Sequence, residues 1–547
     1  MTRPASTTIP SEGLSREAIF EQLEAFTASD WDWRGGRAYA YTFDAGAEAE
    51  AVGKQAFVAF MSKNALDPTF CPSVLELENR VVAMAAAHLG GDEQTVGSFT
   101  SGGTESIILA VKAARDYFRA VRPEITAPQM LLPVTAHAAF HKAGHYLGVE
   151  PVLVDVDPVT FRADPEATGR AITARTILLV GSASSYGHGV VDPIGALGRL
   201  AQERGLLLHV DGCIGGFLLP YFKRLGADVP DFDLSVPGVT SISMDFHKYC
   251  YAPKGASVVL VKTLALRRHQ LFACANWTGY TIVNTTVQST KSAGAMAGAW
   301  AVLNYLGDAG YERIARELLD ATRRLVAGID AIPQLRVLGR PDLPLIAFTS
   351  DEINVFHLID AMKARGWYIQ PQLRLGRHRE NVHLSVNPSN VQHTEALLAD
   401  LREAAAGVKA RPGSRIARAV SATFGRLDPE LLSDEVFARL IGMAGIKSVG
   451  VPEAMAEIND VMNALPPRLS ERLLIEYVNR LFVQPGVDAT RGIGARPHPL
   501  PRGPRPDEGV NGHGRGAPPP AWSALPLVGR ALALARALQR WLVGPAA

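Results

Sequence analysis

The hydrophobic pattern of this chain alternates short apolar runs with longer amphipathic stretches. Runs rich in β-branched and aliphatic residues occur at 129–136 (QMLLPVTA), 150–156 (EPVLVDV), 176–184 (TILLVGSAS), 205–212 (GLLLHVDG), 239–245 (VTSISMD) and 256–262 (ASVVLVK). Helical stretches alternate with these runs. Strands that alternate with helices predict a mostly parallel sheet covered by helices, with ligand groups gathered at the strand ends.

The segments on either side of this alternation predict further parts of the molecule. Helix, a Trp- and Gly-containing loop and a second helix are predicted over 15–60, and a smaller α/β domain follows the helix-rich stretch at 299–326. The tract GARPHPLPRGPRPDEGVNGHGRGAPPP predicts disorder. The expected parts are an N-terminal arm (1–60), a large domain (61–300), a small α/β domain (301–410), a helical extension (411–482), a linker (483–520) and a C-terminal helix (521–547).

The C-terminal helix is predicted to be amphipathic. On a helical wheel Arg536, Gln539 and Arg540 fall on one side, and Trp541 with several leucines falls on the other. The segment is too short and too charged to span a bilayer, so one interpretation is an interfacial helix that makes peripheral membrane contact. A helix that docks on the protein's own surface or on a partner is an equally good interpretation.

Composition narrows the class of protein. The 547 residues are 47% hydrophobic, which predicts a globular protein of two or more domains. The formal net charge of +1 argues against a nucleic-acid partner. Four cysteines without CxxC pairs suggest neither a disulfide framework nor a metal site. With no secretory signal and no apolar spanning segment in the sequence, we expect a cytoplasmic protein.

Residues 98–117 (SFTSGGTESIILAVKAARDY) predict an anion site. The small residues from Thr100 to Glu105 enter an apolar-periodic helix, which leaves free backbone N–H groups at its N-terminus. That arrangement favours a phosphate. Taken alone, an ordinary capping turn is at least as good an interpretation.

Two ionisable residues follow buried strand-like runs. Asp211 ends such a run, and a carboxylate in that position implies a cationic partner. Lys248 follows His247 just after a second such run. Desolvation there would lower the pKa of the amine and prepare it to bond an aldehyde. The ordinary alternatives are a turn aspartate and a surface lysine.

Considered together, the three features predict one cofactor. A helix N-terminus for a phosphate, an aspartate for a pyridinium nitrogen and a lysine for an aldehyde are what pyridoxal 5'-phosphate requires. The aspartate would keep the ring nitrogen protonated, so that the ring can absorb the electrons of a substrate carbanion.

In the order Gly-Gly-Thr, Asp, His-Lys the sequence resembles fold-type-I pyridoxal-phosphate enzymes of the group II decarboxylase superfamily, and within it the sphingosine-1-phosphate lyases. The resemblance spans about 31–440 and is strongest over 98–262. It is carried by TSGGTESIILAVKAARD, TAHAAFHKAGHYLGV, HGVVDPI, HVDGCIGGFLLPY and TSISMDFHKYCYAPKGASVVL. It implies an α/β fold with a mostly parallel seven-stranded sheet, a smaller C-terminal α/β domain, and a homodimer in which the segment 289–293 reaches the partner's cofactor.

The resemblance also implies residue roles around the cofactor. Lys248 would bond the cofactor aldehyde, Asp211 would pair with the ring nitrogen, and His137 would stack on the ring. The cofactor phosphate would be held by Gly102, Gly103, Thr104 and His247.

Some of the substrate-binding positions match the lyases and others differ from them. Tyr41 and Lys254 match an arm tyrosine and a phosphate-site lysine of the lyases, and we expect Tyr186 and His188 in the pocket without an assigned role. At three positions the sequence departs from the lyases: Asp67 stands where they have a histidine, Ile282 where they have a tyrosine, and Lys291 where they have an arginine. A carboxylate repels phosphate, and lysine lacks the planar fork of arginine. We therefore expect Asp67 to pair with Lys254 and the substrate's phosphate site to be altered. The alternative is that Asp67 turns outward from the pocket and leaves Tyr41, Lys254 and Lys291 to hold a phosphate.

Three functions remain open on this basis, each with a small-molecule amino substrate. The first is a carbon–carbon lyase that cleaves a 2-amino-3-hydroxy compound to an aldehyde and an amine, and similarity favours it. The second is an amino acid decarboxylase, since the protein selects the bond that breaks by aligning it with the ring. The third, a cofactor-binding protein without turnover, is disfavoured because Lys248, Asp211 and His137 are all present.

Overall fold

The computed structural model describes residues 8–408 and 455–483, which form two compact units. One unit lies within Trp31–Lys409, and the other combines residues 8–30 with 455–483. The predicted linker from residue 484 and the predicted C-terminal helix at 521–547 lie outside the described residues, as does the predicted helical extension before residue 455.

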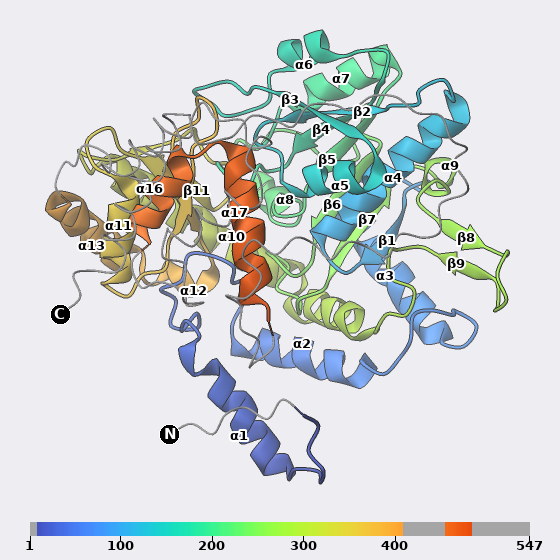
Figure 1. The fold of residues 1–547 in the computed structure, drawn as a ribbon, viewed down its shortest axis with the longest axis horizontal. Helices are drawn as coiled ribbons and strands as arrows, with labels where there is room; N and C mark the ends of the chain where they lie inside the picture. The colour runs from blue at the N-terminus through green and yellow to red at the C-terminus, as the bar shows by residue number, and fades with distance from the viewer. Residues whose placement is uncertain (1–7, 409–454, 484–547) are drawn as a thin grey trace, which may run out of the picture. The chain divides into compact units, whose positions relative to one another are not determined.

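The larger unit is built on a seven-stranded sheet with the strand order β1-β7-β6-β5-β4-β2-β3 (Figure 1). Strands β6, β5, β4, β2 and β3 run parallel to one another, whereas β7 pairs antiparallel with both β6 and β1. The expected mostly parallel α/β sheet is confirmed. The strands span Val96–Thr100 (β1), Gln129–Pro133 (β2), Glu150–Val154 (β3), Thr176–Ser182 (β4), Leu207–Asp211 (β5), Ser241–Asp245 (β6) and Ser257–Val261 (β7).

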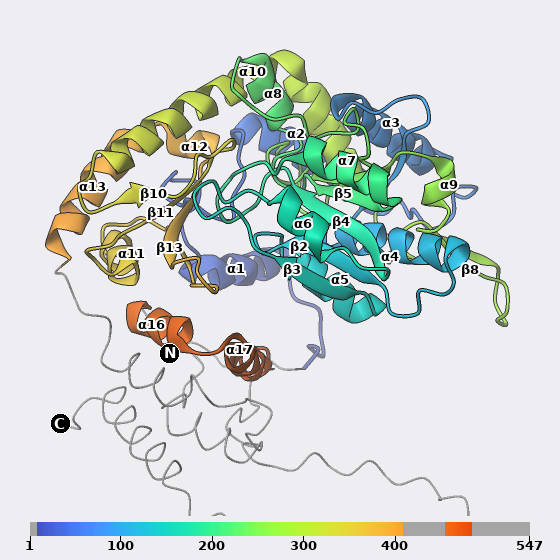
Figure 2. The ribbon, with the colours of Figure 1, turned by 90° about the horizontal axis from the view of Figure 1, so that it is seen from above.

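Helices cover both faces of this sheet (Figure 2). On one face, Ile107 of α4 and Phe140 of α5 pack in the same buried cluster as Val180 of β4. On the other face lie α3 and α7, and a Cβ added to Gly181 would come within 2.5 Å of Ile194 in α7. This double cover explains why the strands are apolar at consecutive positions. The helices are α2 (Ala47–Phe60), α3 (Pro72–His88), α4 (Gly103–Val121), α5 (Ala139–Leu147), α6 (Pro165–Ala171), α7 (Ile194–Arg204), α8 (Leu219–Arg224) and α9 (Leu264–Arg267).

A small antiparallel sheet completes the larger unit. Its strand order is β10-β11-β13-β12, and the long helix α10, kinked at Gly307, leads into it from the large sheet (Figure 2). A separate hairpin, β8–β9, precedes α10. The elements are β8 (Phe272–Cys274), β9 (Ile282–Asn284), α10 (Gly294–Asp330), β10 (Arg336–Val337), β11 (Leu345–Thr349), α11 (Val355–Lys363), β12 (Gln370–Gln372), β13 (Asn381–Ser385), α12 (Pro388–Val391) and α13 (Thr394–Gly407).

The described part of the smaller unit is helical. It contains α1 (Arg16–Phe26), a 3₁₀ turn (Thr27–Ser29), α16 (Ala456–Ala464) and α17 (Pro467–Leu481). Ser15 caps α1 by accepting a hydrogen bond from the Ala18 N–H, as serine commonly does at a helix start. Across the described residues of the chain, none of the helices is both long and apolar enough to cross a membrane.

Candidate active site

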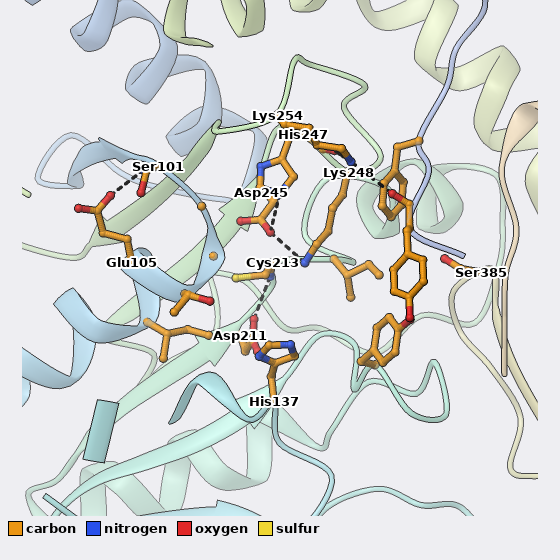
Figure 3. A pocket seen from close by; sticks show the side chains of 18 of the residues that line it. Ser101, Glu105, His137, Asp211, Cys213, Asp245, His247, Lys248, Lys254 and Ser385 are labelled. Carbon is orange, nitrogen blue, oxygen red and sulfur yellow. Dashed lines mark hydrogen bonds and ion pairs between the residues drawn. The ribbon is translucent and has the colours of Figure 1, made fainter. Parts of the chain in front are cut away.

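A cavity of about 650 Å³ opens at the carboxyl ends of β4, β5 and β6 in the larger unit (Figure 3). Ligand groups gather at such strand ends in open α/β sheets, which is where the sequence predicted them. All the cofactor-binding residues named from the sequence line this cavity, together with three of the five substrate residues. They are Gly102, Gly103, Thr104, His137, Asp211, His247, Lys248, Tyr41, Tyr186 and Lys254.

The start of α4 forms one wall of the cavity. Gly103 is the first residue of the helix, and a Cβ there would lie 2.7 Å from Cys213 Sγ and 2.9 Å from Asp245 Oδ2. Glycine is therefore needed for this close approach. Glu105 holds the preceding turn, because its Oε2 accepts a hydrogen bond from the Ser101 N–H at 2.6 Å. The arrangement leaves a helix N-terminus facing the cavity, where an anion is favoured.

Asp211 lies at the end of β5 and is 7% exposed. Its Oδ1 accepts a hydrogen bond from the Cys213 N–H at 3.0 Å. Among the described residues it forms no ion pair. A buried carboxylate without a cationic side chain suits a positively charged ring nitrogen in the cavity, so this residue fits pyridoxal phosphate.

Lys248 pairs with a residue that the sequence did not single out. Its Nζ lies 2.9 Å from Oδ2 of Asp245, the last residue of β6, which is almost fully buried (Figure 3). Asp245 Oδ1 has no hydrogen-bond partner among the described residues. The sequence pattern could have identified Asp245, because it ends a buried strand just as Asp211 does.

The predicted direction of the Lys248 pKa is wrong in this structure. Burial alone would lower the pKa of the amine, as expected from the sequence, but the adjacent Asp245 carboxylate more than offsets burial and raises it. Burial likewise tends to raise the pKa of Asp245, and the charges of Lys248 and His247 hold it below its usual value. The amine and the carboxylate therefore stabilise each other's charged forms.

Two histidines are held by backbone contacts. His137 Nδ1 accepts a hydrogen bond from the Ala139 N–H at 3.2 Å, which directs its proton to Nε2 in the neutral ring. Figure 3 shows His137 beside Asp211. His247 Nδ1 lies 2.7 Å from the Ala256 carbonyl oxygen, and its Cε1 lies 3.7 Å from a Cβ built on Gly102. Burial lowers the pKa of His247.

Lys254 lies at the same cavity as Lys248. Its Nζ is 3.4 Å from the Tyr41 carbonyl oxygen and 5.1 Å from the centre of the Phe43 ring. Burial, followed by repulsion from Lys248, lowers its pKa. It forms no ion pair with any acidic side chain in the described residues.

The ion pair expected between Asp67 and Lys254 is wrong within this chain. Asp67 Oδ1 accepts hydrogen bonds from the Thr69 N–H at 2.7 Å and the Thr69 hydroxyl at 2.6 Å, so the carboxylate closes its own turn. Asp67 and Lys291 instead line a separate hollow of about 220 Å³ between 65–78 and 283–291. Lys291 Nζ donates to the Phe99 carbonyl oxygen at 3.2 Å. These two predicted substrate residues are not at the Lys248 cavity.

Other residues that line the cavity were missed from the sequence. Gln370 of β12 and Ser385 of β13 reach it from the small sheet, and Ser182 and Ser184 reach it from the end of β4. Polar residues in strands of a distant sheet carry no local signal of this placement. His188, which was expected in the pocket, is buried against Phe161, with 4.0 Å between the ring centres.

The fold and this site define a fold-type-I pyridoxal-phosphate enzyme. The pyridoxal-dependent decarboxylase conserved domain matches residues 2–351, and a pyridoxal-dependent enzyme C-terminal putative HTH domain matches 418–480. The chain belongs to the pyridoxal-dependent decarboxylase family and is a lyase that depends on pyridoxal 5'-phosphate.

Individual relatives agree with this assignment. Sphingosine-1-phosphate lyase of Arabidopsis thaliana is 40% identical over 413 residues, which cover 74% of each chain. A probable L-aspartate decarboxylase of Pyrococcus furiosus is 32% identical and covers 66% of this chain and 94% of its own. The structure of the Burkholderia pseudomallei sphingosine-1-phosphate lyase superposes with a TM-score of 0.71 at 37% identity and covers 74% of this chain and 93% of its own.

Proposed function

We propose that this enzyme breaks the Cα–Cβ bond of a 2-amino-3-hydroxy compound and releases an aldehyde and an amine. The observation that carries the proposal is one cavity that combines a lysine amine, a buried carboxylate without a cationic partner and a helix N-terminus. The similarity to sphingosine-1-phosphate lyases over three quarters of the chain favours this bond over others.

In this proposal the cavity residues divide the work of holding the cofactor. Lys248 bonds its aldehyde, Asp211 keeps the ring nitrogen protonated, and His137 packs on the ring. The backbone of Gly102, Gly103 and Thr104, with His247, binds its phosphate. When bound, the cofactor supplies an electron sink for the bond that breaks. Whenever Lys248 Nζ is free, the Asp245 carboxylate beside it keeps a proton on that amine.

Lys254 is the group that we propose for an anionic part of the substrate. Its support is the absence of an acidic ion-pair partner among the described residues and its position at the cavity beside Tyr41. Because Asp67 does not line the Lys248 cavity of its own chain, it does not neutralise Lys254 there. A phosphorylated amino alcohol is therefore compatible with the cavity as a substrate class. Replacing Lys254 with methionine should raise KM for a phosphorylated amino alcohol more than for the unphosphorylated one.

Decarboxylation of an amino acid is the second candidate. It is favoured by the Pyrococcus furiosus relative and by the substitutions at Asp67 and Lys291, which depart from the lyase pattern. Incubating the holoenzyme separately with 3-hydroxy amines and with amino acids, and assaying aldehyde against carbon dioxide, separates the two reactions. Carbon dioxide release without aldehyde would overturn the first proposal.

We further propose that the enzyme works as a homodimer in which the segment 289–293 of one copy reaches the cavity of the other. The hollow that contains Asp67, Ser289 and Lys291 is supported as part of this interface by the exposed rings of Phe70 and Tyr280 beside it. Sedimentation equilibrium of the holoenzyme tests the proposal. A fully active monomer would contradict it.

We also propose that the enzyme is cytoplasmic and contacts a membrane peripherally through residues 521–547. It is supported by the two-sided distribution of polar and apolar residues in that segment. Flotation with anionic liposomes should separate the full chain from a chain that ends at Pro520. Equal partitioning of the two would overturn it.

A further inference from the structure

The hydroxyl of Tyr186 is held by a residue of the small sheet. Tyr186 lies in the loop between β4 and α7, and its hydroxyl donates a hydrogen bond to Gln370 Oε1 at 2.5 Å. Gln370 is the first residue of β12. Both side chains line the cavity that contains Lys248. Two segments far apart in the sequence therefore meet at this hydrogen bond.

The ring of Tyr186 is held by the neighbouring strand. It packs against the ring of His383, with 4.4 Å between the ring centres and 34° between the planes. His383 is fully buried in β13 and lies directly opposite Gln370 in the strand register. Burial lowers the pKa of His383 to about 3, so its ring stays neutral. A cross-strand pair thus presents both a flat surface for the phenol ring and an acceptor for its hydroxyl.

This contact decides what Tyr186 can offer to the cavity. A phenol has one proton, and here that proton points to Gln370, so the oxygen can only accept a hydrogen bond from the cavity side. Burial raises the pKa of Tyr186 to about 12, so the hydroxyl keeps its proton near neutral pH. The Tyr186 hydroxyl oxygen is therefore an uncharged hydrogen-bond acceptor with a fixed orientation in the cavity.

We infer that Gln370 is a positioning residue that makes Tyr186 Oη accept a hydrogen bond from the 3-hydroxyl of the substrate, and so selects 2-amino-3-hydroxy compounds over their 3-deoxy analogues. The inference rests on the proposed lyase function. Tyr186 and Lys248 line one cavity, and Lys248 marks where the amine-bearing carbon is bound. The hydroxyl on the adjoining carbon is then the donor that Tyr186 can meet.

The experiment compares two ligands with the holoenzyme. Rapid-mixing absorbance of the bound cofactor gives dissociation constants for a 2-amino-3-hydroxy compound and for its 3-deoxy analogue. One hydrogen bond should give the wild type about a five- to tenfold preference for the hydroxy compound. Tyr186→Phe should reduce this preference to about onefold, and Gln370→Leu should reduce it severalfold, because the phenol hydroxyl then loses the fixed orientation in which it accepts from the substrate.

Two further variants separate positioning from a general structural effect. Gln370→Glu keeps an oxygen acceptor for the phenol, so the preference should be retained even if overall affinity changes. Gln372→Leu alters the same residue type two positions along the same strand, at a residue that does not itself line the cavity, and should leave the preference unchanged. Cofactor absorbance equal to that of the wild type shows that each variant is folded.

The outcomes distinguish failure of this inference from failure of the proposed lyase function on which it rests. A preference that survives Gln370→Leu, or one that is lost in Gln370→Glu as completely as in Gln370→Leu, would overturn the inference alone. A wild type that binds both ligands equally would do the same. A holoenzyme whose absorbance responds to neither ligand would overturn the proposed function and the inference together.

Discussion

The cavity at Lys248 and the hollow beside Asp67 are built in different ways. Groups in the cavity come from the ends of adjacent strands, and Lys248 lies 2.9 Å from the opposite charge of the buried Asp245. The hollow is formed by loops, and Asp67 is exposed and bonded to Thr69 two residues away. Residues at strand ends are placed by the whole sheet, whereas a loop carboxylate is first satisfied by its own turn.

The same direction of pKa shift has different causes in the two regions. The pKa of Asp67 is lowered chiefly by the Thr69 hydrogen bonds. Burial tends to raise the pKa of Asp245, and the neighbouring Lys248 and His247 charges lower it overall. Substitutions in the Lys248 cavity should therefore alter the cofactor site strongly, whereas substitutions at Asp67 should mainly affect its local turn.

The largest effect is expected for Lys248→Ala. Turnover should fall by at least about a thousandfold, because no other amine at that position can bond the cofactor aldehyde. Borohydride treatment of the wild-type holoenzyme should attach the cofactor covalently to Lys248, as peptide mass mapping will detect. Lys223→Ala, at an exposed ion pair, is the control. An adduct mapped to a different lysine would refute the role of Lys248.

Gly103→Ala tests the close packing at the start of α4. The added Cβ would meet Cys213 Sγ and Asp245 Oδ2, and overpacking of this kind should weaken cofactor binding by about ten- to a hundredfold. Gly195→Ala, whose Cβ would have only Arg199 Nη1 at 3.9 Å, is the matched control. Fluorescence titration with pyridoxal phosphate measures both. Wild-type affinity in Gly103→Ala would contradict the close-approach argument.

Asp245→Asn tests the charge pair through pH. In the wild-type apoprotein Asp245 raises the Lys248 pKa, so the reactive neutral amine is scarce near neutral pH and the rate of cofactor attachment should increase with pH. Without the carboxylate the pKa falls, and attachment at pH 7 should accelerate by about tenfold or more. Stopped-flow absorbance between pH 6 and 9 measures the rate. An unshifted pH profile would show that Asp245 does not control the amine.

The smallest effect is expected for Asp67→Asn. Its carboxylate is exposed and bonded within its turn, so kcat/KM should change by less than about threefold. Asp92→Asn is a matched control, because Asp92 accepts hydrogen bonds from Gln94 and Thr95 in a similar turn. A much larger loss for Asp67→Asn alone would show that this residue, and not only the segment 289–293, reaches the cavity of a second copy, and would reverse the contrast between the two regions.

The residues that could be predicted at the site share one property. Asp211 ends a continuously apolar run, Lys248 follows a second strand-like run, and Gly102 to Thr104 begin an amphipathic helix, so local pattern placed all of them at one edge of a parallel sheet. Asp245 carried the same signal and was overlooked. Gln370 and Ser385 could not be found in this way, because their approach depends on how the small sheet packs against the large one.

By itself, the sequence determined the mostly parallel sheet, the cofactor class and the residues that follow its buried strands, because periodicity and turn chemistry are local properties. The tertiary structure decided the reversal of β7, the pairing of Lys248 with Asp245 and the contact between Tyr186 and Gln370. It also separated Asp67 from Lys254. These outcomes depend on distances between segments far apart in the chain, which only the packing of sheets, helices and loops establishes.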